Sequence, residues 1–423
     1  SDYQRFRMPE GELLERKLHK SFVPDRNNQE IGKSMLFNGG LNALQAILLA
    51  IDEEMLRMRH NDKQKKNPIP PIFRVKDVYF EVDNLIERHF AGHDIKPEVF
   101  EAEDMEKLIA RIKKDLPLAV FLNPMSNMYD MKVTGIIQLL EALSNDHEWR
   151  QKVDSEFYSR YIYIVVDNST LGRLAQWQNF SFKKLPDFVK IISFESLVKF
   201  RQDGQELTQA ALVTTFGTDI DSRLESIRRQ RGFVCPENTI RKLGTFIPED
   251  ILRKKMDRHS RNSKVLAEDL AKHSKDKDSF IGEVISPFLE SHPQSNTAKL
   301  EMAGAGALFN VGFNFDFLKD YQEKIINYDK TTMLDNPIKG RMLEEKQTLI
   351  ADGFLKMVFM FAKEVGLEIN EGTSYGFNIT RLAVYKRNDP KDGYSQIPYI
   401  RVAVGTENIK DIKLLTTIIK RLS

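Results

Sequence analysis

The sequence predicts an α/β protein in which helices cover a mostly parallel sheet, followed by a smaller α+β domain. Short apolar runs rich in β-formers alternate with longer amphipathic runs through the first half of the chain. This alternation is typical of a parallel sheet whose strands are joined by helices. From about Asp250 the helical patterns become longer. We therefore divide the chain into an N-terminal arm (1–20), a large domain (21–255) and a small C-terminal domain (256–423).

The individual elements follow from the spacing of the apolar residues. In the first half, this spacing predicts helices over 11–19, 41–58, 105–114 and 133–143. Apolar β-former runs predict strands at 73–82 (with its surrounding turn), 116–122, 161–166, 189–194 and 210–215. In the second half we predict helices over 251–273, 355–365 and 408–422, and strands over 306–315 and 399–404.

Composition narrows the class of protein. The 423 residues suffice for two or three domains. Cys235 is the single cysteine, which excludes an intrachain disulfide and suits a reducing compartment. The 63 basic and 61 acidic residues predict neither nucleic-acid nor membrane-surface binding, and no apolar run reaches membrane-spanning length. We expect a cytoplasmic protein with no nucleic-acid or membrane partner.

An acid and a lysine follow two of the predicted strands. Asp167 ends the run 161–166, and Lys199 comes shortly after the run 189–194, leaving room for a helical crossover between them. The carboxyl ends of parallel strands meet at one edge of a sheet, where ligands bind. Asp167 could simply end a strand, and Lys199 could be a solvated surface group. Together they suit pyridoxal phosphate, whose Schiff base needs a lysine and whose protonated pyridine nitrogen needs a carboxylate.

Two further features suit a phosphate group. Gly39 and Gly40 precede Leu41 at the start of a long predicted helix, where a flexible backbone and free N–H groups can bind an anion. Ser196, three residues before Lys199, could donate to the same phosphate. An ordinary helix-starting turn is the alternative reading of the glycine pair.

Three other positions were considered as ligand contacts. Arg401 lies inside an apolar strand, so its guanidinium needs either a structural ion-pair partner or a substrate carboxylate. Tyr79 could be a core residue or could stack on a flat ring. His89 and His93 share one face of a helix, but no carboxylate or cysteine pattern completes a metal site around them. We therefore predict no metal.

Nearly the whole chain resembles the pyridoxal-phosphate enzymes of cysteine and methionine metabolism, such as cystathionine γ-synthase, cystathionine γ-lyase and methionine γ-lyase. The motifs that carry the resemblance occur in the family's order. They are YQRFRMPE at 3–10, GGL at 39–41, DVY at 77–79, VVDNST at 165–170, SLVK at 196–199, MDRHSRN at 256–262, LESHPQ at 289–294 and YIRVAVGTEN at 399–408.

The resemblance implies a fold of the aspartate-aminotransferase type (pyridoxal-phosphate fold type I) and a role for each matched residue. Lys199 would carry the cofactor and move protons, Asp167 would pair with the pyridine nitrogen, and Tyr79 would stack on the ring and assist proton transfer. The phosphate would be held by Gly39, Gly40, Leu41 and Ser196.

The remaining implied contacts involve the substrate and a second subunit. Arg401 would take the substrate α-carboxylate, Ser374 would lie on the substrate side, and Asn127 would contact the cofactor's phenolic oxygen. Tyr3 and Arg5 would reach the phosphate of a neighbouring subunit, which implies a homodimer or, as is usual in the family, a homotetramer. Family chains usually carry a segment before this motif, so residues upstream of Ser1 are also expected.

The implied activity is γ-elimination or γ-replacement on an amino acid. The alternatives are a β-lyase, a racemase or aminotransferase on the same scaffold, and a cofactor-binding homologue without catalysis. The departures from the family cluster around the substrate: Val198 replaces a threonine, 80–82 replaces G-G-T, and 372–377 replaces much of a substrate-side segment. We therefore expect the cofactor site to be kept and the substrate to be specialised.

Overall fold

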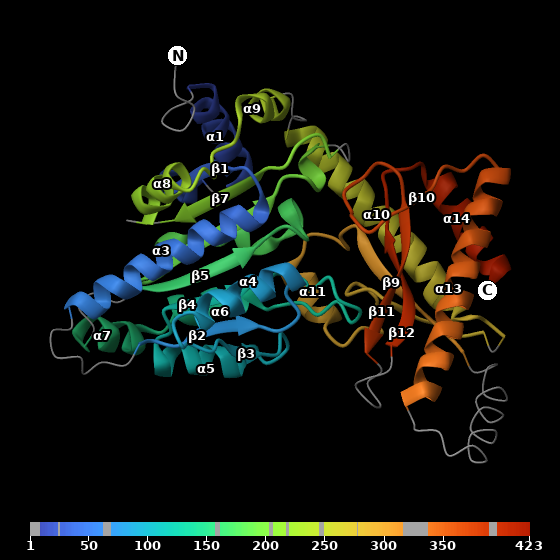
Figure 1. Ribbon diagram of the computed structural model, residues 1–423, viewed down its shortest axis with the longest axis horizontal. Coiled ribbons are helices and arrows are strands. Elements are labelled where there is room, and N and C mark those ends of the chain that lie inside the picture. Colours follow the sequence, from blue (N-terminus) through green and yellow to red (C-terminus); the bar gives the residue numbers. More distant parts are fainter. Residues whose placement is uncertain are drawn as a thin grey trace. The chain divides into compact units, whose positions relative to one another are not determined.

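The computed structural model places the chain in two compact units (Figure 1). The first comprises Ser1–Met128, Lys132–Arg253 and Asn296–Ala303, and the second comprises Tyr129–Met131, Lys254–Ser295 and Gly304–Ser423. The residues that the structure describes are 9–23, 26–61, 69–156, 161–202, 206–216, 220–244, 249–276, 278–315, 337–388 and 396–423.

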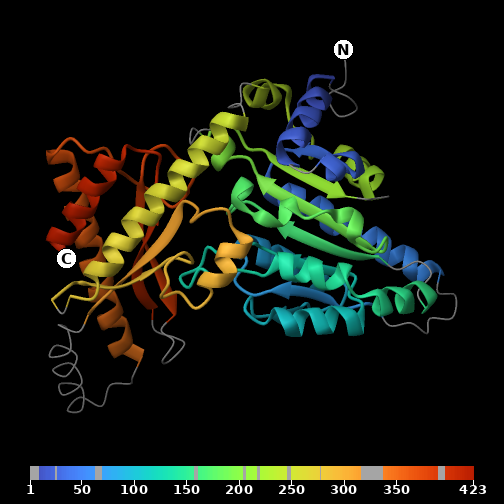
Figure 2. The ribbon, with the colours of Figure 1, turned by 180° about the vertical axis from the view of Figure 1, so that it is seen from behind.

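The first unit is built on seven strands. They are β1 (Gly32–Phe37), β2 (Ile72–Val75), β3 (Glu98–Phe100), β4 (Ala119–Leu122), β5 (Ile162–Asp167), β6 (Val189–Ser196) and β7 (Ala211–Phe216). Their order across the sheet is β1-β7-β6-β5-β4-β2-β3 (Figures 1 and 2). The five strands from β6 to β3 are parallel, and β7 runs antiparallel to both of its neighbours. This confirms the predicted mostly parallel sheet.

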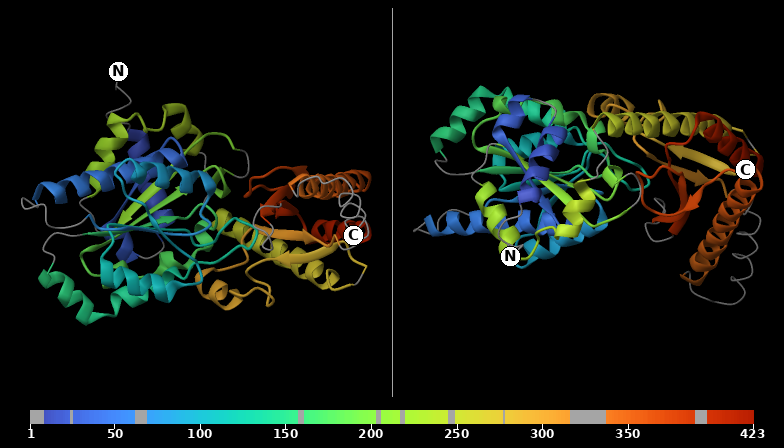
Figure 3. Two further views of the ribbon diagram at one scale, coloured as in Figure 1. Left: turned by 60° about the horizontal axis from the view of Figure 1, so that its bottom comes forward. Right: turned by 90° about the horizontal axis from the view of Figure 1, so that it is seen from above.

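Helices cover both faces of this sheet (Figure 3). The helices of the first unit are α1 (Pro9–Phe22), α2 (Arg26–Ile31), α3 (Gly40–Asn61), α4 (Phe80–Ala91), α5 (Met105–Asp115), α6 (Ile136–Ser144), α7 (His147–Glu156), α8 (Ile220–Gln230), α9 (Glu237–Gly244) and α11 (Ser295–Glu301). Helix α3 packs against β1, β6 and β7, with α4 and α8 beside it. Strands β4 and β7 are buried along their whole length, as expected for strands covered on both faces.

Several boundaries differ from the sequence prediction. The strand predicted from residue 116 begins at Ala119, because Leu116 adopts a positive φ of 48° and caps the end of α5. The strand predicted through residue 82 ends at Val75, and α4 begins five residues later. The crossover between β5 and β6 contains three short 3₁₀ turns, Gly172–Leu174, Gln176–Asn179 and Phe182–Lys184, where an α-helix was expected.

The second unit contains a five-stranded sheet. Its strands are β8 (Ile281–Ile285), β9 (Leu308–Phe313), β10 (Asn370–Glu371), β11 (Arg381–Asn388) and β12 (Gln396–Ala403), in the order β10-β11-β12-β9-β8. Its helices are α10 (Glu249–His273), which begins in the first unit, α13 (Pro337–Glu364) and α14 (Ile409–Leu422). Helix α13 packs on β11 and β12 and against α14. Among the described residues, no helix combines the length and the apolar character needed to cross a membrane.

Two of the matched motifs meet inside the second unit. The buried ring of His259 on α10 contacts the Val404 carbonyl through Nδ1 at 2.7 Å. On the same helix, the Asn262 side chain donates to the carbonyls of Gly405 and Glu407 at 3.2 and 3.0 Å. Burial lowers the pKa of His259 to about 4, so its ring is neutral at pH 7. These residues therefore attach α10 to the end of β12.

A buried glutamate caps a helix of the first unit. Glu301 accepts the Ile137 N–H with both carboxylate oxygens, at 2.9 and 3.1 Å. The N-cap residue of α6, Gly135, has no side chain for this role. A carboxylate suits the N-terminus of a helix, where N–H groups lack partners. Desolvation nevertheless raises the pKa of Glu301 to about 7.

We predict that Glu301→Gln changes how stability depends on pH. The folded chain holds a proton on Glu301 between pH 4.5 and about 7, where the unfolded chain releases it. This contribution to stability is complete below pH 4.5 and is lost as the pH rises through 7. The wild-type advantage over Glu301→Gln in urea unfolding should therefore fall by roughly 2–3 kcal/mol from pH 4.5 to 8.

Glu106→Gln is the control, because Glu106 is exposed on α5. Parallel pH profiles for the wild type and Glu301→Gln would contradict the assignment.

Candidate functional site

The pairing of β5 with β6 brings the candidate acid and lysine to one edge of the sheet. The two strands are parallel, and Asp167, the last residue of β5, lies opposite Phe194. Strand β6 ends two residues later at Ser196, and Lys199 follows in the turn. Lys199 lies close enough to Asp167 for its charge to act on the carboxyl group.

A chain of hydrogen bonds ties the two strand ends together. The Ser169 backbone N–H donates to Asp167 Oδ1 at 3.0 Å. The Ser196 backbone N–H donates to the Ser169 hydroxyl oxygen at 2.9 Å. Ser169 therefore orients the Asp167 carboxylate and holds the end of β6 beside it.

The Asp167 carboxyl group lies in surroundings that disfavour its charge. Burial raises its pKa above the ordinary value, while the Ser169 contacts and the Lys199 charge act in the opposite direction. A carboxylate in such a place is stabilised by a cation at its side. A protonated ring nitrogen would supply such a charge.

A buried polar network supports this turn from behind. The Asn168 amide donates to Glu195 Oε2 at 3.2 Å and accepts the Trp177 indole N–H at 3.2 Å. The side chains of Glu195 and Arg201 are each 5% exposed, and they form an ion pair at 3.8 Å. Arg201 also lies 3.7 Å from the ring centre of Phe22 on α1. A buried hydrogen bond thus joins Asn168, next to Asp167, to Glu195, next to Ser196.

The glycine turn lies next to Ser196. A Cβ atom added to Gly40 would stand 3.7 Å from the Ser196 Cβ, so the helix start and the strand end lie side by side. Gly40 is the first residue of α3, and Leu41 beside it is exposed. The backbone of this helix terminus can bind an anion. Gly39 directly precedes the helix.

Tyr79 and Asn127 follow two other parallel strands. Tyr79 lies after β2, at the N-cap of α4, and is 38% exposed with its ring 4.8 Å from that of Phe80. Asn127 follows β4 and is half-buried. Because β2, β4, β5 and β6 are parallel, these residues belong to the same edge of the sheet as Asp167.

Arg401 lies in the second unit, in a cluster of aromatic side chains. It is 8% exposed on β12, and its guanidinium carbon lies 4.0 Å from the ring centre of Tyr385. Tyr399 stacks on Tyr385 with ring centres 5.8 Å apart. Burial raises the pKa of the Tyr399 hydroxyl, although Arg401 hydrogen-bonds to it and acts in the opposite direction. The planar guanidinium is thus supported by flat rings.

Ser374 belongs to the loop between β10 and β11. The preceding residue, Thr373, accepts a hydrogen bond from the Tyr385 hydroxyl at 3.4 Å, which ties this loop to the Arg401 cluster. Tyr3 and Arg5 lie outside the residues that the structure describes. The structure thus places the other cofactor candidates at one edge of the sheet in the first unit, and the two substrate candidates in the second unit.

Sequence reasoning missed several residues that form these clusters. The contact of Asn168 with Glu195 and that of Ser169 with Ser196 each join residues 27 positions apart, so no local pattern in the sequence indicates them. Tyr385 lies on a strand that was not predicted. The apolar run 382–385, which follows Arg381 and precedes Lys386, was the signal that could have revealed it.

A large cavity lies elsewhere in the first unit. It has a volume of about 1110 Å³ and is lined by residues of α1, β1 and α8, with Cys235 in its wall. None of the candidate cofactor residues lines it. Its size therefore does not make it the chemical site.

The fold is shared with solved structures of enzymes. A cystathionine gamma synthase from Xanthomonas oryzae pv. oryzae has a TM-score of 0.63 at 15% identity, over 100% of this chain and 88% of that one. MetB from Corynebacterium glutamicum has a TM-score of 0.64 at 17% identity, over 100% and 87%. A methionine gamma lyase from Micromonospora echinospora has a TM-score of 0.62 at 16% identity, over 99% and 87%.

This likeness confirms the predicted fold, the type I fold of pyridoxal-phosphate enzymes, across essentially the whole chain. No family model matches the sequence. No curated protein matches it by sequence either.

We predict that Asn168→Ala destabilises the first unit by about 1–3 kcal/mol, because it leaves the buried Trp177 N–H and Glu195 without one of their partners. Asn179→Ala is the matched control, since Asn179 lies in the same crossover but is exposed. Urea unfolding followed by Trp fluorescence measures both. Equal effects of the two substitutions would contradict a structural role for the Asn168 network.

Proposed function

We propose that this chain is a pyridoxal-phosphate enzyme that performs γ-elimination or γ-replacement on an amino acid. The observation that carries the proposal is that Asp167 and Lys199 lie at one edge of a parallel sheet. Gly40, at the start of α3, lies beside Ser196 at the same edge. Proteins of the same fold include a cystathionine gamma synthase and a methionine gamma lyase, which supports this class of reaction.

The residues present fit this cofactor. Asp167 is desolvated and its pKa is raised, so a cationic ring nitrogen beside it would be favourable. The start of α3 and Ser196 together offer backbone N–H groups and a hydroxyl to a phosphate. Tyr79 is exposed enough to offer a ring face. Lys199 supplies the amine at the same strand ends.

Pyridoxal phosphate supplies an electron-withdrawing ring that stabilises negative charge at the α-carbon of a bound amino acid. The protein supplies the remaining functions. Asp167 would keep the ring nitrogen protonated, held in orientation by Ser169. The Lys199 amine would take the proton from Cα and return it in a later step. Tyr79 would cover the ring and assist proton transfer.

Arg401 would bind the substrate α-carboxylate. The guanidinium fork matches the two oxygens of a carboxylate, and the stacking on Tyr385 limits its rotation. Ser374, in the loop tied to Tyr385, would contact the substrate beyond the carboxylate. Variation in this loop would then select the substrate side chain.

We propose further that the working enzyme is a homodimer or homotetramer. Tyr3 and Arg5 would extend from one subunit to the cofactor phosphate of its neighbour. This arrangement would add side-chain donors to the phosphate turn that Gly39, Gly40, Leu41 and Ser196 form in the first unit. Loss of cofactor from a chain that lacks residues 1–8, measured by equilibrium dialysis, tests it.

We predict that Lys199→Ala abolishes turnover and the retained yellow colour of the protein. The lysine provides the covalent attachment that keeps pyridoxal phosphate bound through dialysis. Lys190→Ala is the matched control, because Lys190 lies near the start of β6 and Lys199 follows the end of that strand. Absorption spectra before and after dialysis measure the effect. A wild-type protein that stays colourless with added pyridoxal phosphate would refute the proposed cofactor.

We predict that Arg401→Gln lowers kcat/KM for amino-acid substrates by about 10- to 100-fold, the effect of losing hydrogen bonds to a charged group. Cofactor absorption should remain unchanged. Arg387→Gln is the control on the neighbouring strand β11, where Arg387 pairs with Glu283. A panel of γ-substituted amino acids, assayed for ammonia and keto-acid release, provides the substrate. An Arg401→Gln enzyme with wild-type KM would exclude the carboxylate role.

A further inference from the structure

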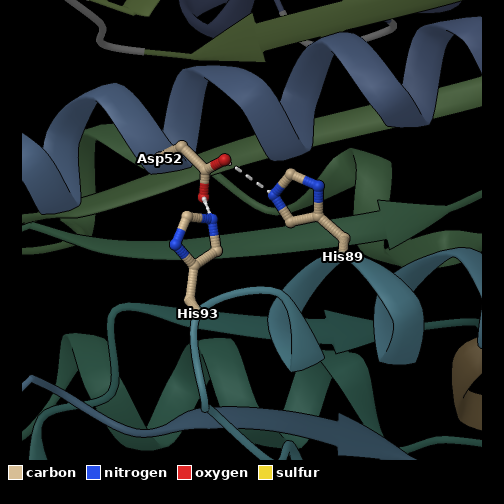
Figure 4. A group of neighbouring side chains, drawn as sticks. All are labelled: Asp52, His89 and His93. Carbon is tan, nitrogen blue, oxygen red and sulfur yellow. Dashed lines mark ion pairs between the residues drawn. The ribbon is translucent and has the colours of Figure 1, made fainter.

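Two histidines and an aspartate come together between helices α3 and α4, away from the candidate cofactor site (Figure 4). His89 Nε2 lies 2.9 Å from Asp52 Oδ2, and His93 Nε2 lies 3.2 Å from Asp52 Oδ1. The three ligand atoms all lie within 4.8 Å of one another. The carboxylate that the sequence did not reveal thus comes from a helix 37 positions earlier in the chain.

We propose that Asp52, His89 and His93 form a binding site for a divalent transition-metal ion such as Zn²⁺. Both rings present Nε2 toward the same carboxylate, and each offers one atom of a type that Zn²⁺ prefers (Figure 4). Ligand atoms on a tetrahedral Zn²⁺ are separated by about 3.3 Å, given bonds of 2.0–2.1 Å. The separations of 2.9 and 3.2 Å, each from one ring to a different oxygen of Asp52, are close to that value.

Two buried atoms of this cluster lack a hydrogen bond within the part of the chain that the structure describes. His89 Nε2 and Asp52 Oδ1 are buried, and among the described residues neither has a hydrogen-bond partner of acceptable geometry, despite their closeness. A buried polar atom without a partner is unfavourable by about 1–3 kcal/mol. A metal ion bound by both would remove this penalty.

The helices explain why the three side chains converge. His89 lies on α4 and His93 in the turn directly after it, one helical turn apart, which places both rings on the side facing α3. The side chains are 14%, 14% and 28% exposed for Asp52, His89 and His93, so an ion can enter and water can complete its coordination.

The proposed metal site lies too far from the candidate cofactor site to take part in its chemistry, so a structural or regulatory role fits it. Asp52 is twelve residues along α3 from Gly40, or about 18 Å at the rise of an α-helix. A metal ion there cannot touch the substrate near Lys199. It would instead fasten α3, which begins at the phosphate turn, to α4, which begins beside Tyr79.

The test is Zn²⁺ binding by the full chain without a histidine tag, stripped with chelator and dialysed. Isothermal titration should show one Zn²⁺ bound with micromolar or tighter affinity, and Co²⁺ should produce visible absorption bands. His89→Gln with His93→Gln should weaken binding about 100-fold or more. His273→Gln should not change it, although His273 also contacts a carboxylate, that of Asp276.

Zn²⁺ should also raise the Tm of the wild type and not that of the double variant. Circular dichroism confirms that the variants fold. His93→Gln alone serves if the double variant does not fold, because His93 is the most exposed of the three. Absence of stoichiometric Zn²⁺ binding by the wild type, or undiminished binding by a folded variant, would overturn the proposal.

Discussion

The candidate cofactor site depends on the parallel pairing of β5 and β6. Their register puts Asp167 opposite Phe194, so that β5 and β6 end within two residues of each other at the same edge of the sheet. Ser169 converts this pairing into a fixed geometry, because it bonds to Asp167 and to the backbone of Ser196. A shift of either strand would separate all three groups. The geometry of the candidate site therefore depends directly on the register of the sheet.

This edge of the sheet has a buried polar network beneath it and a desolvated carboxyl group, that of Asp167, on it. Behind it, Asn168, Glu195 and Arg201 form a buried polar network whose members hold each other in place. Networks of this kind specify one arrangement more than they add stability. In front of it, desolvation opposes the charge on Asp167. The contacts from Ser169 and the charge of Lys199 thus offset only part of the effect of desolvation on the pKa of Asp167.

The sequence predicted the central strands of the first sheet, because 161–166 and 189–194 are rich in β-formers and are followed by polar residues. It did not predict β1 or β3. The structure shows the predicted acid and lysine at neighbouring strand ends, while their chemical roles stay predictions. Contacts between distant segments could not be predicted. Asp52 joins His89 and His93 only through the packing of α3 on α4, and Glu301 caps α6 from 164 residues downstream. Neither contact leaves a periodic pattern in the chain.

The cap supplied by Glu301 also affects the order in which parts of the chain can fold during synthesis. Residues Asn296–Ala303 belong to the first unit, yet they lie in the sequence between α10 and β9 of the second. During synthesis on the ribosome, the first unit can form its sheet early, but α6 lacks its cap until Glu301 emerges. The second unit must wait longer, because α10 is held by Val404 and Gly405 at the end of β12. The two units are interleaved, so no single cut in the chain separates them intact.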